Sequence, residues 1–405
     1  MLRHLVLSLV ATLVIAASPQ ARAQDKPEDI NPNMSAEVGE KAVKLVDKFH
    51  ETVVRIPVTV KLANGKPHTG QMVLTMFKPA GAGPFPIVIF NHGRTSKKRA
   101  EAGRFRYLGF AGYVIHRKVA LAVPTRLGYG VSGFDVDPEV WVGKGCEEFS
   151  YTLLVEAHAE QVEATVKYLR KQPWVDARRI VLAGASVGGF GSVTSAALHP
   201  EGVIGVINFV GGAGGSSDHD KVGKPCSSAD VGAKYAAAGS KTRVPTLWIY
   251  AENDKLWGPK IPITWHRAYA SAGGVSEFHM LPPVGDDGHT LLAHGNRQWR
   301  PLTDAFLARL GIPAPKSTAA FPPSGFAPIQ DASKVPLIDA KARQDGYQRF
   351  LRGNIPRAFV IAPNGGWASF YGDEEALEKA LARCEQGGKR KCKPYAVDDA
   401  VVWTP

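Results

Sequence analysis

The pattern of apolar and polar residues changes near Phe85. Residues Thr52–Lys61 and Gly70–Phe77 alternate between apolar and polar side chains, and Asn64-Gly65 lies between them. Alternating runs joined by an Asn-Gly turn predict a β-hairpin with one solvated face. Residues Pro86–Phe90 are instead apolar without alternation, which is typical of a strand buried on both faces.

Similar apolar runs recur along the next 200 residues. We expect strands at residues 112–116, 179–183, 203–210 and 245–250, and a weaker one at 275–281. Amphipathic stretches separate these runs, and the clearest is Tyr151–Lys171, which is apolar at three- and four-residue steps. Strands that alternate with helices predict an α/β fold with a mostly parallel sheet, to which the hairpin adds an antiparallel edge.

The first residues have the features of an export signal. Arg3 and His4 precede an apolar run, Leu5–Ala17, and Ala21-Arg22-Ala23 offers small residues at a cleavage site. We therefore expect residues 1–23 to be a signal peptide and the mature chain to be periplasmic or secreted. An uncleaved membrane anchor is the alternative, but the run is short for a bilayer span of about 20 residues, and no later stretch favours stable membrane insertion.

The sequence also predicts a domain boundary near residue 311. Residues 24–311 contain a helix-like stretch at 37–50, followed by the alternating strands and helices. Residues 312–336 are rich in Pro, Ala and Ser and indicate a linker. Residues 337–405 then predict a small α+β module with a Gly-rich turn at Gly365-Gly366. Its expected helices are residues 339–351 and 373–385, and its expected strands are 357–362 and 393–397.

Composition adds two constraints. The chain has 405 residues, of which 44% are hydrophobic and 21% charged, so it is an ordinary globular protein. The formal charge is +12, but the basic residues are scattered apart from Lys389-Arg390-Lys391. We expect no nucleic-acid partner, since no basic stripe is interleaved with aromatic residues, and the sequence indicates no protein partner.

Four cysteines follow the signal region: Cys146, Cys226, Cys384 and Cys392. Spacing alone leaves three pairings open. Export favours disulfides, and we favour Cys146–Cys226 and Cys384–Cys392. A zinc site is the alternative, but no pair has the close spacing of a zinc knuckle, so no metal is expected.

The most informative passage is Gly184-Ala185-Ser186-Val187-Gly188. It follows an apolar strand directly and precedes a helix-like stretch, Phe190–Leu198. That context is what a nucleophile elbow requires, because the serine must sit on a tight strand-to-helix turn and the glycines leave room for neighbouring backbone. We therefore predict that Ser186 is a nucleophile, against the alternative of a simple turn.

A serine nucleophile needs a base, and the base needs an orienting acid. In this architecture both follow later strands, with the acid before the histidine. Asp254 comes just after the strand at 245–250 and is the predicted acid, with Glu252 as its rival. His289 lies in a Gly-rich loop after the next strand and is the predicted base, while His279 and His294 fall in a strand and on a helix.

The oxyanion formed by nucleophilic attack needs two fixed donors. The backbone N–H of Val187 is one candidate. The other is the backbone N–H of Arg94, in the loop after the first buried strand, where His92-Gly93 allows the chain to turn close to the site. A generic strand-end turn is the alternative for His92-Gly93.

These residues resemble landmarks of the dienelactone hydrolase-like branch of the α/β-hydrolases. The likeness rests on Phe90-Asn91-His92-Gly93, Gly184-Ala185-Ser186-Val187-Gly188-Gly189, Ala251-Glu252-Asn253-Asp254 and Gly288-His289, within residues 52–310. It implies a Ser-Asp-His triad, no cofactor, and hydrolysis of an ester or related acyl bond. The dienelactone enzymes proper use cysteine as nucleophile, so serine here favours a general esterase.

The region from Pro356 to Asp399 resembles a small accessory module of exported bacterial proteins. We expect its tryptophans, Trp367 and Trp403, to be core residues rather than ligand-stacking ones.

Three functions remain open from the sequence. The first hypothesis is an esterase that hydrolyses a small-molecule ester, with the loops at 127–130 and 211–239 as walls of the substrate pocket. A prolyl-oligopeptidase-like serine peptidase shares fold and triad and is the second. A non-catalytic binding protein on a hydrolase scaffold is the third, although intact Ser186, Asp254 and His289 argue against it.

Overall fold

In the computed structural model, residues 49–95, 99–133, 135–216, 221–312, 322–386 and 391–405 are described. The expected signal peptide, most of the helix-like stretch at 37–50, part of the linker, and Lys389-Arg390 lie outside these residues. The division of the chain at 312–336 stays a prediction.

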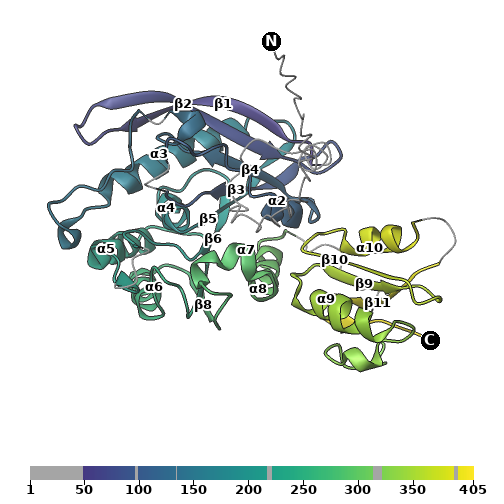
Figure 1. The fold of residues 1–405 in the computed structure, drawn as a ribbon. Helices are drawn as coiled ribbons and strands as arrows, with labels where there is room; N and C mark the ends of the chain where they lie inside the picture. Colours follow the sequence, from purple (N-terminus) through teal and green to yellow (C-terminus); the bar gives the residue numbers. More distant parts are fainter. Residues whose placement is uncertain (1–48, 96–98, 134, 217–220, 313–321, 387–390) are drawn as a thin grey trace, which may run out of the picture. The chain divides into compact units, whose positions relative to one another are not determined.

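An eight-stranded sheet in the order β1-β2-β4-β3-β5-β6-β7-β8 organises the larger part of the chain (Figure 1). Strand β1 pairs antiparallel with β2 in one continuous register, and β2 pairs antiparallel with β4. All later neighbours pair parallel. The predicted fold class, a mostly parallel sheet with an antiparallel N-terminal hairpin, is confirmed. The strands are β1 (Thr52–Lys61), β2 (Pro67–Phe77), β3 (Phe85–Asn91), β4 (Ala120–Thr125), β5 (Val175–Ala185), β6 (Val203–Phe209), β7 (Thr246–Ala251) and β8 (Ser276–Leu281).

Helices cover both faces of this sheet (Figure 1). On one face, α3, α4, α5 and α6 follow one another, each in contact with the next. On the other face, Phe110 and Tyr113 of α2 pack against Trp299 of α8, with ring centroids 6.0 and 4.9 Å apart. The helices are α2 (Leu108–Ile115), α3 (Thr152–Leu169), α4 (Val187–Ala196), α5 (Ser228–Gly239), α6 (Lys260–Ser271), α7 (Leu291–His294) and α8 (Asn296–Arg309), with short 3-10 turns at Gly130–Ser132, Cys146–Glu148 and Gly288–Thr290.

The strand expected at residues 112–116 is wrong. These residues lie in or just after α2, and β4 follows at Ala120–Thr125, between β2 and β3. Phe110 to Ile115 are all buried, and a short apolar run of this kind does not distinguish a buried helix from a buried strand. Strand β4 contains Pro124, and because proline is rare inside a sheet, the sequence did not indicate a strand there.

The C-terminal residues form a separate four-stranded antiparallel sheet in the order β10-β9-β11-β12. Its elements are β9 (Arg357–Ile361), β10 (Trp367–Tyr371), α10 (Ala376–Cys384), β11 (Lys393–Val397) and β12 (Ala400–Val401), after a 3-10 turn at Ala332–Lys334, a π-helix at Ala342–Tyr347 and α9 (Gln348–Arg352). Strands β10 and β12 were not expected from the sequence. The single helix expected at 339–351 is a π-helical turn followed by α9.

Two apolar clusters hold this sheet. Tyr347 and Phe350 pack with Phe359 and Trp403 in one cluster, and Ala358 and Val360 pack with α10 in the other. Trp403 is therefore a core residue, as expected. For Trp367 the same prediction is wrong, because Trp367 stacks on Phe359 at 5.3 Å but keeps 37% of its surface exposed.

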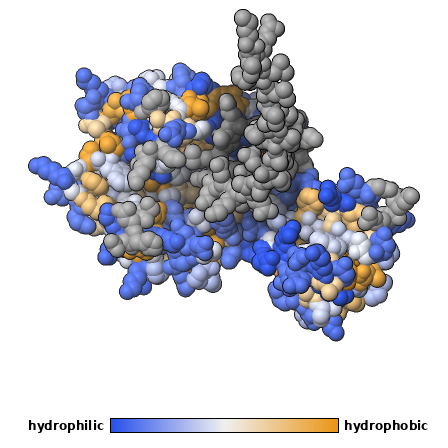
Figure 2. Space-filling model, viewed as in Figure 1, coloured by the Kyte–Doolittle hydropathy of each residue, from blue (hydrophilic) through white to orange (hydrophobic). Residues whose placement is uncertain are grey.

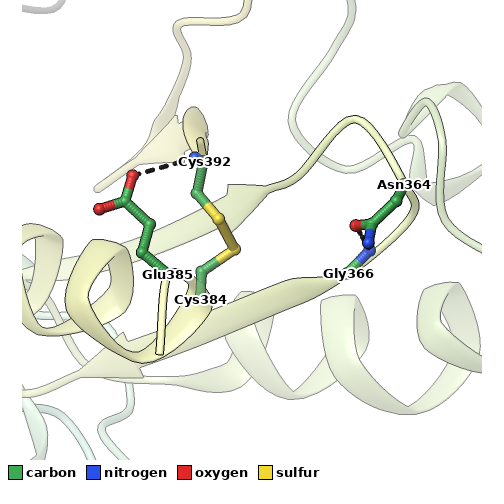
Figure 3. Close-up of a disulfide and its surroundings, with 5 residues drawn as sticks. All are labelled: Asn364, Gly366, Cys384, Glu385 and Cys392. Atoms are coloured by element: carbon green, nitrogen blue, oxygen red, sulfur yellow. Dashed lines mark hydrogen bonds between the residues drawn. A yellow bond between two sulfur atoms is a disulfide. The ribbon is translucent and has the colours of Figure 1, made fainter. Parts of the chain in front are cut away.

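The Cys384–Cys392 disulfide joins the end of α10 to the residue before β11 (Figure 3). Beside it, the Cys392 N–H donates to the Glu385 carboxylate at 3.0 Å. On the same part of the chain, Gly365 takes a φ of +84° in the turn between β9 and β10, which is where the sequence predicts a Gly-rich turn.

Polar residues spread over most of the face seen in Figure 2, and apolar residues form small separate patches on it. Mixed surfaces of this kind are usual for globular proteins. Across the described residues, no helix has the length and apolar character needed to span a bilayer.

Candidate active site

Ser186 lies at the tight turn between β5 and α4. Its backbone has φ 56° and ψ −129°, a conformation that costs a non-glycine residue about 1–3 kcal/mol. The turn is held by hydrogen bonds from the Ser186 N–H to the Phe209 carbonyl at 3.0 Å, and from the Gly212 N–H to the Ser186 carbonyl at 3.2 Å. A strained serine fixed in this way projects its hydroxyl beyond the carboxyl end of the sheet.

The glycines around Ser186 are required by close backbone packing. A Cβ at Gly188 would overlap the carbonyl oxygens of Asn91 and His92, and one at Gly184 would overlap the Gly188 carbonyl. The sequence prediction that these two glycines make room for neighbouring chain therefore has a direct basis in the structure.

Asp254 and His289 are brought together by the loops after β7 and β8. The Asp254 Oδ2 lies 3.0 Å from the His289 Nδ1. The other carboxylate oxygen, Oδ1, accepts the backbone N–H groups of Leu256 at 2.8 Å and Trp257 at 3.0 Å. Asp254 is only 1% exposed, so its charge acts on the histidine with little screening by water.

The rival residues lie elsewhere. Glu252 and His294 are exposed. His279 is in β8, where its ring lies 3.9 Å from the Glu277 carboxylate and keeps 35% of its side chain exposed. It is therefore less packed than the sequence suggested.

The electrostatic surroundings favour protonation of His289. Burial lowers the pKa of its imidazole, but the charge of Asp254 and the hydrogen bond to it outweigh burial, and the pKa is raised above its ordinary value. A histidine that gains a stabilised positive charge in this way can accept a proton from a neighbouring hydroxyl.

Two polar residues beside the predicted acid and base hold their loops together. The Asn253 amide accepts from the Val284 N–H at 2.9 Å and donates to the Gly285 carbonyl at 3.0 Å. Asp287 accepts from the backbone N–H of His289 at 2.9 Å and of Lys255 at 3.0 Å. Sequence reasoning missed these roles, although Asn and Asp in loops are the usual cappers of free backbone N–H groups.

Trp257 connects the histidine with the serine turn. Its Nε1 donates to the Val210 carbonyl at 2.7 Å, and its ring lies 5.4 Å from the His289 ring in an edge-to-face contact. The same ring packs against Gly212, whose N–H is bonded to Ser186. Among the described residues no hydrogen bond joins the Ser186 hydroxyl to His289; catalytic hydrogen bonds of this kind commonly tighten only in the complex with substrate.

The loop after β3 lies against the serine. A Cβ placed on Gly93 would be 3.3 Å from the Ser186 Cβ and 3.9 Å from its Oγ. Two N–H groups belong to this neighbourhood: that of Val187, which opens α4 and has no intrahelical acceptor, and that of Arg94, which follows Gly93. The His92 ring is buried, stacked on Phe105 at 3.7 Å.

The loop after β6 is tied to the segment before α3. Cys146 and Cys226 form a disulfide, which is the pairing favoured from the sequence. The Tyr151 hydroxyl donates to the Cys226 carbonyl at 2.7 Å, and the Cys226 N–H donates to Gly214 at 2.9 Å. The Gly-rich stretch that begins at Gly211 is therefore fixed at two points: at Gly212, by its hydrogen bond to the Ser186 carbonyl, and at Gly214, by the hydrogen bond from Cys226.

In the part of the chain that the structure describes, no group of three His, Cys, Asp or Glu side chains could hold a metal ion.

No protein-family model matches this sequence, and no curated protein matches it. Solved structures are similar in fold at low sequence identity. A Klebsiella pneumoniae structure assigned as a dienelactone hydrolase shares 14% identity, with a TM-score of 0.42, over 64% of this chain and 99% of that one. An esterase from Pyrococcus furiosus shares 15%, with a TM-score of 0.41, over 68% and 96%.

An acylaminoacyl peptidase from Pyrococcus horikoshii shares 13% identity with a TM-score of 0.49. The match covers 70% of this chain and 45% of the peptidase, so the chain spans less than half of that protein.

Proposed function

We propose that this chain is an exported serine hydrolase that cleaves carboxylic esters through an acyl-enzyme intermediate. Ser186 is the nucleophile, His289 the general base and Asp254 the orienting acid. The observation that carries the proposal is the strained backbone of Ser186, φ 56°, directly between a buried strand and a helix. Strain at a non-glycine residue persists where the fold fixes it, and it concentrates at functional sites.

The chemistry follows from the arrangement. His289 takes the Ser186 proton as the hydroxyl oxygen attacks the ester carbonyl, and Asp254 stabilises the imidazolium that forms. The carbonyl oxygen gains a negative charge, for which the N–H groups of Val187 and Arg94 are the proposed donors. His289 then protonates the leaving alcohol, and water, activated by the same histidine, releases the acid.

Export is supported by chemistry at the cysteines. All four are paired in disulfides, and disulfides persist in oxidising compartments. The proposed location is therefore the periplasm or the extracellular space.

A substrate panel tests this function. The purified chain is assayed on p-nitrophenyl esters of increasing acyl length and on aminoacyl p-nitroanilides, beside Ser186→Ala and the matched control Ser240→Ala at the exposed end of α5. We expect ester hydrolysis by the wild type and the control, and a loss of at least about a thousandfold in Ser186→Ala. Equal rates in Ser186→Ala would contradict the proposal, and a preference for anilides would assign the chain to the peptidases instead.

A further inference from the structure

Arg126 occupies an unusual place beside the loop that follows β3. It comes directly after β4, which pairs parallel with β3, so its side chain begins at the same edge of the sheet as His92, Gly93 and Arg94. Arg126 is 0% exposed. A fully buried arginine is rare unless its donors are used, and two of the partners of Arg126 are carbonyls of this loop.

Two backbone carbonyls of the loop accept from the Arg126 guanidinium. Its Nη1 donates to the His92 carbonyl at 2.6 Å, and its Nη2 lies 3.4 Å from the Gly93 carbonyl. The Gly93 carbonyl also lies 2.7 Å from the His92 Nδ1. The His92 Nε2 accepts the Arg126 backbone N–H at 3.1 Å, so in the neutral ring the proton is on Nδ1, which donates to Gly93.

The carbonyl of Gly93 and the N–H of Arg94 belong to one peptide unit. Because that unit is planar and trans, its C=O and N–H point in opposite directions. Bonds that hold the Gly93 carbonyl toward Arg126 and His92 therefore direct the Arg94 N–H away from them. Gly93 itself packs against Ser186, so the orientation of this peptide decides whether its N–H serves the oxyanion.

Glu139 contacts both Arg126 and Arg94. Its Oε1 pairs with the Arg126 Nε, and its Oε2 lies 3.3 Å from the Arg94 Nη1. The Tyr129 hydroxyl donates to the same Oε2 at 3.1 Å. Glu139 is also 0% exposed. Burial raises the pKa of this carboxyl, but Arg126 and its other cationic neighbours hold the pKa well below its usual range, so the pair stays ionised.

We infer that Arg126, clamped by Glu139, is a positioning residue for the oxyanion donor: it fixes the Gly93–Arg94 peptide so that the Arg94 N–H faces the Ser186 hydroxyl. The inference rests on the proposed serine hydrolase function. It requires an arginine, because the planar guanidinium spreads five donors over a fork, whereas a lysine presents one compact ammonium group. Arg126→Lys keeps the charge but cannot serve both carbonyls and the carboxylate.

The experiment measures kcat per active site, with sites counted by titration with a fluorophosphonate. Arg126→Met alone leaves Glu139 short of a partner and is expected to fold poorly, so the test pairs it with Arg126→Met/Glu139→Gln, which removes both charges. Arg117→Met is the matched control. Arg117, just after α2, is also buried, pairs with Asp304 and donates to the Tyr113 carbonyl at 2.6 Å.

The double variant should lose about 100-fold in kcat per titrated site, the cost typical of one oxyanion donor, with KM changed less than threefold. Affinity for a trifluoromethyl ketone, whose adduct carries the oxyanion, should fall in parallel with kcat. Arg126→Lys should fall between wild type and the double variant. Arg117→Met should lower thermal stability and leave kcat per titrated site unchanged.

Normal kcat per titrated site in the double variant, with fewer sites titrated, would overturn the inference and leave Arg126 a purely structural residue. A wild type that reacts with no fluorophosphonate would instead remove the proposed function itself, before any variant is compared.

Discussion

The Cys146–Cys226 disulfide closes a large loop around the proposed active site, and its removal has a calculable effect. The two cysteines are 80 residues apart, whereas Cys384 and Cys392 are 8 apart. In the chain-entropy treatment, a bridge stabilises by restricting the unfolded chain, which gives about 4.5 kcal/mol for the long loop and about 2.5 kcal/mol for the short one. A large domain loses roughly 2–4 °C in Tm for each kcal/mol of lost stability, so the long bridge contributes roughly 9–18 °C to Tm.

The assay compares Cys146→Ser/Cys226→Ser with Cys384→Ser/Cys392→Ser by calorimetric unfolding and ester kinetics. The first variant should show the larger loss of Tm and a raised KM, because the loop that contains Cys226 also contains Gly212, which is bonded to the Ser186 carbonyl. The second should leave KM unchanged.

Two results would refute this reasoning. If Cys146→Ser/Cys226→Ser lost no more Tm than Cys384→Ser/Cys392→Ser, loop closure would not set the stabilisation. An unchanged KM in that variant would show that the bridge does not hold the substrate pocket in place.

Four further predictions concern the site itself. The pKa of His289 is raised above the ordinary 6.5, and catalysis needs the neutral ring, so kcat/KM should fall as pH drops through an apparent pKa above 6.5; a midpoint at or below 6.5 contradicts this. Asp254→Asn should move that midpoint down and reduce kcat by about 10⁴-fold, and a kcat within tenfold of wild type would show that Asp254 is not the acid. Gly188→Ala should abolish activity and lower Tm, since its Cβ overlaps two carbonyl oxygens, whereas Gly145→Ala meets no atom within 4 Å and should change neither. Asn253→Ala, measured by steady-state kinetics, should reduce kcat about tenfold or more because small displacements of catalytic groups are costly; Asn253→Asp, which keeps the acceptor for Val284, should retain more activity.

Much of the larger sheet could be predicted because strands buried on both faces leave a plain trace in the sequence. The runs that became β3, β5, β6 and β7 are solidly apolar and separated by amphipathic helices. The signal failed where a helix is equally buried, as at α2, and where proline interrupts a strand, as at β4. In the C-terminal sheet, β10 has the mixed sequence Trp-Ala-Ser-Phe-Tyr, and its outer residues stay exposed, so no clear period marked it.

The candidate site divides in the same way. Ser186, Asp254 and His289 could be proposed because each follows a strand at a position where the chemistry needs it. Arg126 and Glu139 could not, because nothing local distinguishes them from surface charges. Their importance arises from the pairing of β3 with β4, which sets Arg126 beside His92 although the two are 34 positions apart.

The central claim, that Ser186 is the nucleophile, is tested most directly by mapping a covalent fluorophosphonate adduct with peptide mass spectrometry. The account predicts one adduct per chain, on Ser186, that is lost in Ser186→Ala and formed much more slowly in His289→Ala. An adduct on another residue, or labelling that survives in Ser186→Ala, would contradict it.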